Sequence, residues 1–455
     1  MNPLDYLKEN EAKSLEQLKD LLRIPSVSAQ TAHKKDMESC AQWVADYLKK
    51  LDFKAEILDT GGHPVVFGEY HKSDDLPTIL IYGHYDVQPA DPLELWKTAP
   101  FDPIEENGYL IARGATDDKG QFFAHLKGAE SYLKTAGSLP LNIKFMIEGE
   151  EEVQSENLPL FIEKNKDKLA ADVVLVSDGS QFGIDLPAIN YGLRGIAFVE
   201  VKVTGPDRDL HSGSYGGVIA NPVNVLAKLI GQLHDDEGRI AIDGFYDNVY
   251  TSSDWEQNQL ANLPFDADEY LATTGSPKYR GEKGFTPLEH TWIRPTLDCN
   301  GITGGYQGEG AKTIIPSWAS TKITMRLVPD MRPDEICDKI EAYLKKICPD
   351  YVTLKVIKHG GGNPVQVPTD GPWLKAAAKA VKTAFGKDPF FTKEGGSIPV
   401  VETFSAVLGL DTLLIGFGQH DDNAHSPNER FLIKDFHRAC QTSAALFDEL
   451  SKVKV

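Results

Sequence analysis

Short apolar runs alternate with helical patterns along the first part of the chain. The segments 14–24 and 36–51 carry apolar residues three or four positions apart, which is typical of amphipathic helices. Between such patterns lie short, predominantly apolar runs at 78–82, 143–147 and 173–176. Each run is too short and too uniformly apolar for a surface element, so each predicts a strand buried on both faces. Their alternation with helices predicts an α/β fold with a doubly wound, mostly parallel sheet.

The pattern changes after Gly192, where apolar and polar residues begin to alternate. Val199, Val201 and Val203 lie on one face of a predicted strand at 196–204. Further predicted elements are helices at 221–233 and 334–347 and strands at 320–328 and 351–358. Half-polar strands with two helices predict an open sheet covered on one face, and therefore a separate, smaller α+β domain.

A helix-rich pattern returns near residue 367 and ends with an apolar run at 412–418 and a last helix. The simplest organisation is one α/β domain interrupted by the smaller domain. We expect residues 1–193 and 367–455 to form the first domain and residues 194–366 the inserted one. The long polar stretch within the insert, at about 235–300, fits neither pattern.

The composition narrows the possible partners. Acidic residues outnumber basic residues by 67 to 47, and the net charge of −20 argues against nucleic acid, which requires Lys and Arg to neutralise phosphates. No apolar run approaches the roughly 20 residues of a membrane span, and the polar start lacks a signal-peptide pattern. Five scattered cysteines without a CxxC motif argue against a disulfide framework and a cysteine-rich zinc site. We therefore expect a soluble, cytoplasmic protein with no membrane partner.

Histidines and carboxylates stand directly after the predicted buried strands. These residues are His84 and Asp86 after 78–82, Glu148, Glu150, Glu151 and Glu152 after 143–147, Asp178 after 173–176, and His420, Asp421, Asp422 and His425 after 412–418. A further pair, Asp117 and Asp118, stands just before a predicted helix. In open α/β sheets, ligands bind at the carboxyl ends of the strands. The sequence therefore places a set of potential metal ligands where a ligand is expected.

These residue types favour a two-metal site. Imidazole and carboxylate ligands suit zinc or manganese, and their number exceeds the three protein ligands usual for one catalytic metal. Two metals bridged by a carboxylate and a water would account for the surplus. Taken singly, an aspartate after a strand is usually a turn or cap residue, but the joint occurrence at four strand ends favours metal binding. A dinucleotide-dependent oxidoreductase is disfavoured because no GxGxxG follows the first buried run.

The motifs of the chain resemble those of a known family. GHYDVQP, RGATDDKGQ, EGEEE, SDG, YGLRG, DLHSGSYGG, EGGSIP and DDNAHSPNE follow one another from residue 83 to about residue 430. In this order they resemble the co-catalytic metallopeptidases, a family that includes aminoacylases, carboxypeptidase G and succinyl-diaminopimelate desuccinylase. The similarity is greatest to the branch of carnosinase and cytosolic non-specific dipeptidase. The resemblance implies a catalytic α/β domain with an inserted lid and dimerisation domain.

The resemblance also implies roles for individual residues around two divalent metal ions, zinc or manganese. His84 and Asp178 would bind one metal, Glu152 and His425 the other, and Asp117 would bridge both. Glu151 would be the general base, and Asp86 would orient the ring of His84. Relatives imply a cis peptide between Asp117 and Asp118. Glu150 departs from the pattern, since this branch often carries Met there, so the choice of the base depends on the register of three consecutive glutamates.

The inserted domain carries the residues that the resemblance assigns to substrate. His211 would reach the active site of a neighbouring subunit, where it could stabilise an oxyanion. Thr313, Arg326 and Ser397 match substrate-contacting positions. An arginine can grip a terminal carboxylate through two parallel hydrogen bonds, which suits Arg326 to the free end of a peptide.

We therefore interpret the chain as a homodimeric metallo-dipeptidase. It would hydrolyse dipeptides and short peptides with a free C-terminal carboxylate by means of a metal-bridging hydroxide. An amide hydrolase that acts on N-acyl amino acids with the same site is the alternative. A catalytically silent binding protein of the same fold is a rival of another class, but the retention of Glu151 and of every ligand disfavours it.

Overall fold

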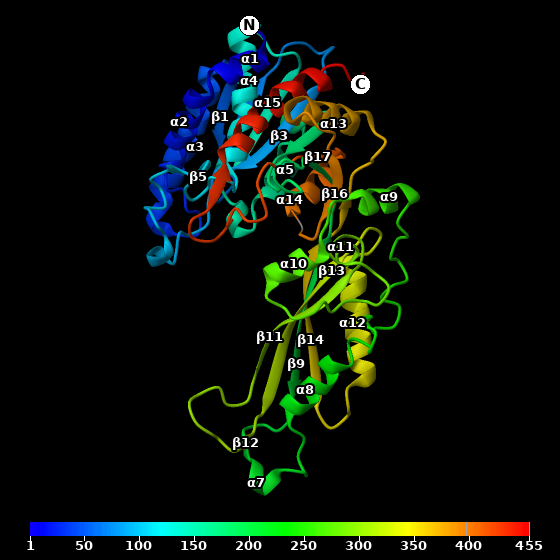
Figure 1. Ribbon diagram of the computed structural model, residues 1–455. Helices are drawn as coiled ribbons and strands as arrows, with labels where there is room; N and C mark the ends of the chain where they lie inside the picture. Colours follow the sequence, from blue (N-terminus) through cyan, green and yellow to red (C-terminus); the bar gives the residue numbers. More distant parts are fainter. Residues whose placement is uncertain (397, 455) are drawn as a thin grey trace. The chain divides into compact units, whose positions relative to one another are not determined.

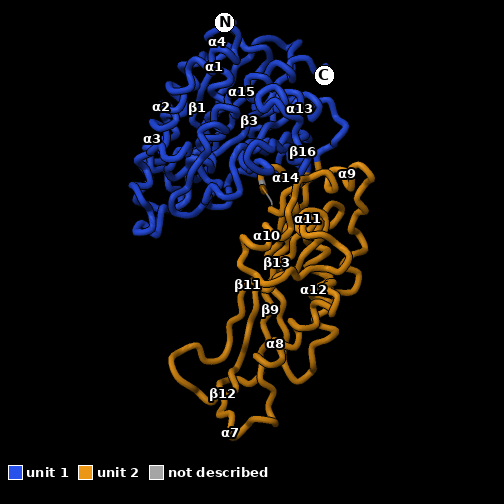
Figure 2. The backbone as a smooth tube through the Cα atoms, in the orientation of Figure 1, with its two compact units in different colours: residues 1–191, 367–392, 403–455 blue, residues 192–366, 393–402 orange. Residues whose placement is uncertain are grey.

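The computed structural model describes residues 1–396 and 398–454 of the chain and divides into two compact units (Figure 2). Unit 1 comprises Met1–Tyr191, Val367–Thr392 and Thr403–Val455, and unit 2 comprises Gly192–Gln366 and Lys393–Glu402. Among the described residues, no helix combines the length and the apolar character that crossing a membrane would require.

A large sheet forms the centre of unit 1 (Figure 1). Its strands, in spatial order, are β1 (Lys54–Leu58), β2 (Val65–Tyr70), β6 (Asn142–Glu148), β3 (Thr78–His84), β7 (Val173–Val176), β17 (Thr412–Leu414) and β8 (Ala188–Leu193). Strand β8 also pairs with β15 (Val365–Gln366) and β16 (Phe390–Glu394). The central strands β6, β3, β7 and β17 are parallel, whereas β1, β2 and β8 pair antiparallel with their neighbours. The predicted mostly parallel α/β sheet is confirmed, and the apolar runs at 78–82, 143–147 and 173–176 form its core.

Both faces of this sheet are covered, as successive residues of β3 show. Ile79 and Ile81 belong to the main apolar core, whereas Tyr82 points to the other face and packs edge-on against Phe404, with ring centroids 5.7 Å apart. The helices that contribute to the main core include α2 (Glu11–Leu22), α3 (Lys34–Lys50), α4 (Lys119–Thr135), α13 (Pro372–Phe385) and α15 (Ile433–Leu450). This two-sided burial explains why the central strands are mostly apolar on both faces rather than at every second position.

The predicted strand at 412–418 is shorter in the structure, because β17 ends at Leu414. From there the chain runs against the loop that follows β7: the N–H of Ile415 donates to the carbonyl of Val176 (3.0 Å), and the N–H of Gly418 donates to that of Gly179 (3.0 Å). A Cβ at Gly416 would lie 2.1 Å from the carbonyl carbon of Gly179, so the backbones approach too closely for any other residue. This close approach brings the loops after β7 and β17 together.

Unit 2 contains a four-stranded antiparallel sheet. Its strands, in spatial order, are β11 (Thr296–Gly304), β13 (Trp318–Leu327), β9 (Gly195–Thr204) and β14 (Thr353–Gly362). Val199, Val201 and Val203 of β9 are buried on one face, as predicted, in a core shared with α8 (Pro222–Gly231) and α12 (Pro333–Ile347). Unit 2 also contains a separate antiparallel pair of short strands, β10 (Leu210–His211) and β12 (Ile314–Ile315), which are far apart in sequence.

The polar segment at about 235–300 forms three short helices in unit 2. They are α9 (Asp254–Asn262), α10 (Ala267–Thr274) and α11 (Pro287–Trp292). Capping boxes start two of them, with Ser253 paired to Glu256 at α9 and Thr286 paired to Glu289 at α11. Local caps rather than an amphipathic pattern therefore define these helices.

Candidate metal centre

Five side chains of unit 1 converge beyond the carboxyl ends of the parallel strands. His84 ends β3, Asp117 precedes α4, Glu152 lies in the 3-10 turn Glu151–Val153, Asp178 follows β7, and His425 lies in the loop after β17. They form two groups that share Asp117, and within each group one ligand atom per residue lies within 4.8 Å of the others. The structure thus brings together all five residues that the sequence predicts as metal ligands.

The distances within the two groups are short. His84 Nε2 lies 3.1 Å from Asp117 Oδ1 and 3.8 Å from Asp178 Oδ2. His425 Nε2 lies 2.9 Å from Asp117 Oδ2 and 3.1 Å from Glu152 Oε2. Each oxygen of Asp117 therefore faces a different group, which is the arrangement that a bridging carboxylate requires.

The charge of the site fits a pair of divalent cations. Among the described residues, no Lys or Arg nitrogen forms an ion pair within 4.0 Å with Asp117, Glu152 or Asp178. Burial raises the pKa of Asp178 well above its ordinary value, and the nearby charge of Asp117 adds to the effect. Hydrogen bonds with Asp117 and Glu152 raise the pKa of His425 to about 10, so a proton on this imidazole can offset part of the charge of the carboxylates. Binding of two divalent cations would release that proton and neutralise the carboxylates instead. Nitrogen and oxygen ligands of this kind suit zinc and manganese.

Asp86 connects the first metal ligand to the turn that carries the second. His84 Nδ1 lies 3.0 Å from the carbonyl oxygen of Asp86 and 3.4 Å from its carboxylate. The same carboxylate accepts hydrogen bonds from the N–H groups of Glu151 (3.3 Å) and Glu152 (3.1 Å). The ring of His84 is thus oriented mainly by the main-chain carbonyl, while the Asp86 side chain holds the glutamate turn.

The three consecutive glutamates differ in their partners. The carboxylate of Glu150 accepts from Asn157 Nδ2 (3.0 Å) and from the N–H of His63 (3.1 Å), so its oxygens are engaged away from the ligands. Glu152 accepts from Gln88 Nε2 (2.8 Å) and faces His425. The carboxylate of Glu151 accepts no hydrogen bond from any residue that the structure describes. Burial raises the pKa of Glu151 to about 7, although the nearby His84 opposes this rise.

Other residues support the ligands, and the sequence analysis did not assign them this part. The peptide bond between Asp117 and Asp118 is cis, as the resemblance implied. Asp118 accepts from the N–H of His84 (3.1 Å), and the buried carboxylate of Glu429 accepts from the N–H of Asp117 (3.1 Å). The signal for Glu429 was its place in the same DDNAHSPNE motif as His425, but only the fold reveals its partners.

The other predicted site residues belong to unit 2. His211 is exposed, and its Nδ1 accepts from the N–H of Gly213 (3.1 Å). Thr313 is exposed directly before β12, and its carbonyl accepts from the N–H of Ser212 (3.0 Å). Arg326 is half-buried on the polar face of β13, opposite Thr296 of β11. Ser397 lies outside the described residues.

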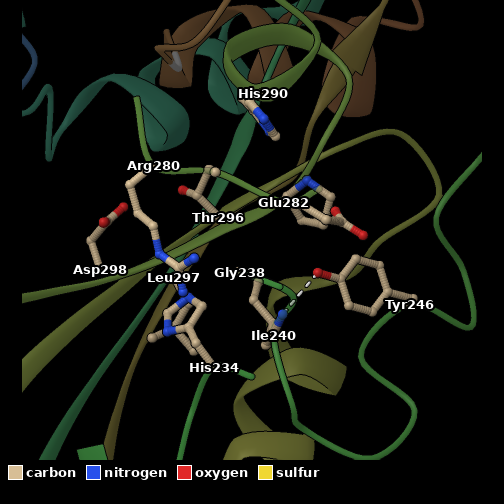
Figure 3. A pocket seen from close by; sticks show the side chains of 12 residues that line it. His234, Gly238, Ile240, Tyr246, Arg280, Glu282, His290, Thr296, Leu297 and Asp298 are labelled. Atoms are coloured by element: carbon tan, nitrogen blue, oxygen red, sulfur yellow. Dashed lines mark hydrogen bonds between the residues drawn. The ribbon is translucent and has the colours of Figure 1, made fainter. Parts of the chain in front are cut away.

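A separate cavity of about 350 Å³ lies within unit 2 (Figure 3). Its wall has mixed charge, with Arg280, His234 and Asp298 on one side and Glu282 on the other. Glu282 is engaged by Arg294, at distances of 2.7 Å and 2.9 Å. Neither group of potential metal ligands found among the described residues includes a residue of this cavity. Both groups of potential metal ligands belong to unit 1.

Comparison with known proteins agrees with this geometry. The family model described as peptidase family M20/M25/M40 matches residues 80–449. A Cys-Gly metallodipeptidase, DUG1, from Candida albicans is 35% identical, with 97% of this chain and 96% of that protein covered. The crystal structure of human carnosine dipeptidase 1 superimposes with a TM-score of 0.83 at 30% identity over 99% of this chain and 98% of that one. An M20 metallo-carboxypeptidase, Sso-CP2, from Sulfolobus solfataricus has a TM-score of 0.86 at 33% identity over 97% and 99% of the two chains.

Proposed function

Because this chain belongs to peptidase family M20/M25/M40, we propose that it is a dinuclear metallo-dipeptidase that hydrolyses dipeptides and short peptides with a free C-terminal carboxylate. The observation that carries the proposal is the pair of ligand groups that share Asp117. The proteins reported above are named as a dipeptidase acting on Cys-Gly, a carnosine dipeptidase and a metallo-carboxypeptidase, which favours peptides over N-acyl amino acids as substrates.

The residues of unit 1 would hold two divalent cations, zinc or manganese. His84, Asp117 and Asp178 would bind one ion, and Asp117, Glu152 and His425 the other. Such a pair supplies Lewis-acid activation of a water molecule and of the scissile carbonyl when it is bound. The protein holds the ligands in place through Asp86, which supports both the His84 ring and the turn of Glu151 and Glu152.

Glu151 would act as the general base. Its carboxylate is free of described hydrogen-bond donors, whereas Glu150 is held by Asn157 and His63, and Glu152 faces His425. A carboxylate that is spent neither on a metal nor on the scaffold can take the proton of the attacking water and return it to the leaving amine. These different partners support Glu151 rather than its neighbours in this role.

Arg326, Thr313 and Ser397 would contact the substrate, with the guanidinium of Arg326 on its terminal carboxylate. We further propose a homodimer in which His211 serves the active site of the partner subunit, together with a cytoplasmic location. In support, His211 is exposed on unit 2, whereas every proposed metal ligand belongs to unit 1.

Mixing two inactive variants tests the shared site. Subunits with His211→Ala and subunits with Glu151→Ala should each be nearly inactive alone. A heterodimer would own one site with both residues intact, and random reassortment makes about half of the dimers heterodimers, so roughly a quarter of the wild-type activity should return. If His211 acts within its own chain, no complete site can form and mixing should restore nothing.

A substrate panel tests the function itself. The metal-free protein, prepared with a chelator, should not hydrolyse dipeptides, and zinc or manganese should restore turnover. Dipeptides, C-terminally amidated dipeptides and N-acetyl amino acids should be compared at equal concentration, with free dipeptides cleaved fastest. Full turnover without metal would contradict the two-metal proposal, and a preference for N-acetyl amino acids would identify a deacylase instead.

A further inference from the structure

Glu429 is a fully buried carboxylate that the proposed chemistry does not use. It follows His425 by four positions and directly precedes the short strand β18 (Arg430–Leu432). Its Oε2 accepts hydrogen bonds from Arg113 Nη1 (2.7 Å) and from the N–H of Gly114 (2.8 Å). Its Oε1 accepts from the N–H groups of Thr116 (2.9 Å) and Asp117 (3.1 Å). One side chain thus holds the whole loop that leads to the shared ligand.

These contacts connect two ligand loops that are far apart in sequence. The carbonyl of Glu429 also accepts from the N–H of Ala112 (3.1 Å), so both its main chain and its side chain grip the segment before Asp117. A second link joins the same loops, since Thr116 Oγ1 donates to Asp422 Oδ2 (3.1 Å). The loop of His425 and the loop of Asp117 therefore behave as one piece, fixed by buried hydrogen bonds.

The charge of Glu429 is matched locally. Arg113 is buried as well, and the other donors are main-chain N–H groups, so the carboxylate is paired without the side chain of any metal ligand. An ionised carboxylate suits this environment because it accepts only, and every neighbouring group donates. A glutamine at this position would place its NH₂ group, which donates, against N–H groups that also donate.

We propose that Glu429 is a positioning residue for the metal pair: it sets the main chain of Asp117 against the loop of His425, and so fixes the spacing of the ligand that both metals share. The inference rests on the proposed function, because it assigns a purpose to the ligand groups. It concerns the binding of both ions at once, since Asp117 belongs to both groups.

Metal affinity, measured with the whole protein, tests the proposal. Zinc and manganese would be titrated into chelator-treated wild type and into Glu429→Gln, with free metal buffered by a competing chelator. We expect the variant to bind both ions more weakly by about tenfold or more, which is the usual effect of losing a residue that orients metal ligands. At saturating metal, KM for a dipeptide should stay near the wild-type value because Glu429 does not line the proposed substrate contacts.

Glu130→Gln is the matched control. Glu130 is also a buried carboxylate of unit 1 with several donors, from Tyr6 (2.9 Å), Tyr47 (2.8 Å) and Lys127, but it lies far along α4 from the ligands. It should lower thermal stability without weakening metal binding. An equal loss of metal affinity in both variants would overturn the proposal, because the loss in Glu429→Gln would then reflect general destabilisation rather than misplaced ligands.

The conservative variant Glu429→Asp keeps the charge but shortens the reach, so it should fold and still bind metal more weakly than wild type. Should Glu429→Gln fail to fold, this variant decides the matter, and wild-type affinity in it would overturn the proposal. The wild-type arm is independent of the variants. A wild type that binds two ions but cleaves no peptide would defeat the proposed function while leaving the positioning role intact.

Discussion

A fall in pH should destabilise unit 1 through His125. This residue lies in α4 and is buried, with Nδ1 3.0 Å from Ser443 Oγ and Nε2 2.9 Å from Ser177 Oγ. Burial lowers the pKa of His125 from its ordinary 6.5 to about 3. In the unfolded chain the imidazole of His125 is therefore protonated below about pH 6.5, whereas in the folded protein it stays neutral until the pH approaches about 3.

The sign and size of the effect follow from this difference. The stabilisation is complete above pH 6.5 and is lost as the pH falls from 6.5 toward 3, at about 1.4 kcal/mol for each pH unit. At about pH 5 the loss attributable to His125 should be about 2 kcal/mol relative to about pH 7.5.

Denaturant unfolding of wild type and His125→Gln at these two pH values measures the effect. Glutamine can bond to both serines but does not titrate, so the free energy of unfolding of the variant should fall by about 2 kcal/mol less than that of the wild type. His71→Gln, at a half-exposed position, is the matched control for the replacement of a histidine by glutamine as such. Equal losses in wild type and His125→Gln would refute the reasoning, because the burial of a neutral imidazole would then not contribute.

Two further predictions concern the general base and the packing beside the first metal ligand. Glu151→Gln should keep both metals, as measured by metal analysis, and should lower kcat by about 10²-fold or more, because a general base contributes on that scale. Glu152→Gln should instead lose metal. The opposite pattern would mean that Glu152 is the base and Glu151 the ligand. Gly83→Ala should lower the free energy of unfolding by about 1–3 kcal/mol, because its Cβ would lie 2.6 Å from the Cβ of Phe122, and overpacking costs that much. Gly231→Ala, where a Cβ would meet nothing within 4 Å, should not destabilise, and equal losses in both glycine variants would contradict the packing argument.

The sequence predicted the centre of the large sheet well because the strands β3, β6 and β7 are buried on both faces. Short, predominantly apolar runs at 78–82, 143–147 and 173–176 have few other interpretations. Polar residues directly after parallel strands lie at one edge of the sheet. The three helices of the segment at about 235–300 were missed for the opposite reason. They are six to nine residues long and begin at local caps, so no apolar periodicity accompanies them.

The support of the ligands was less predictable than the ligands themselves. Asp86 was expected to orient His84 with its carboxylate, but the nearer contact is its main-chain carbonyl. Glu429 lies next to His425 in sequence, yet its partners lie more than 300 positions away. Such contacts depend on the path of the main chain through two loops, which residue patterns do not encode locally.

The place of β17 in the sheet has a consequence for synthesis on the ribosome. In the sheet, β17 lies between β7 and β8. In synthesis, however, β17 follows β8 only after the whole segment Gly192–Gln366 has been translated. Until β17 emerges, the nascent chain holds two strands with open, apolar edges, and such edges invite pairing with other chains. The last-made part of the molecule also delivers His425. We therefore expect chaperones to bind the ribosome-bound intermediate until β17 is made. We also expect the metal ions to bind after chain release rather than during elongation, because His425 is made so late.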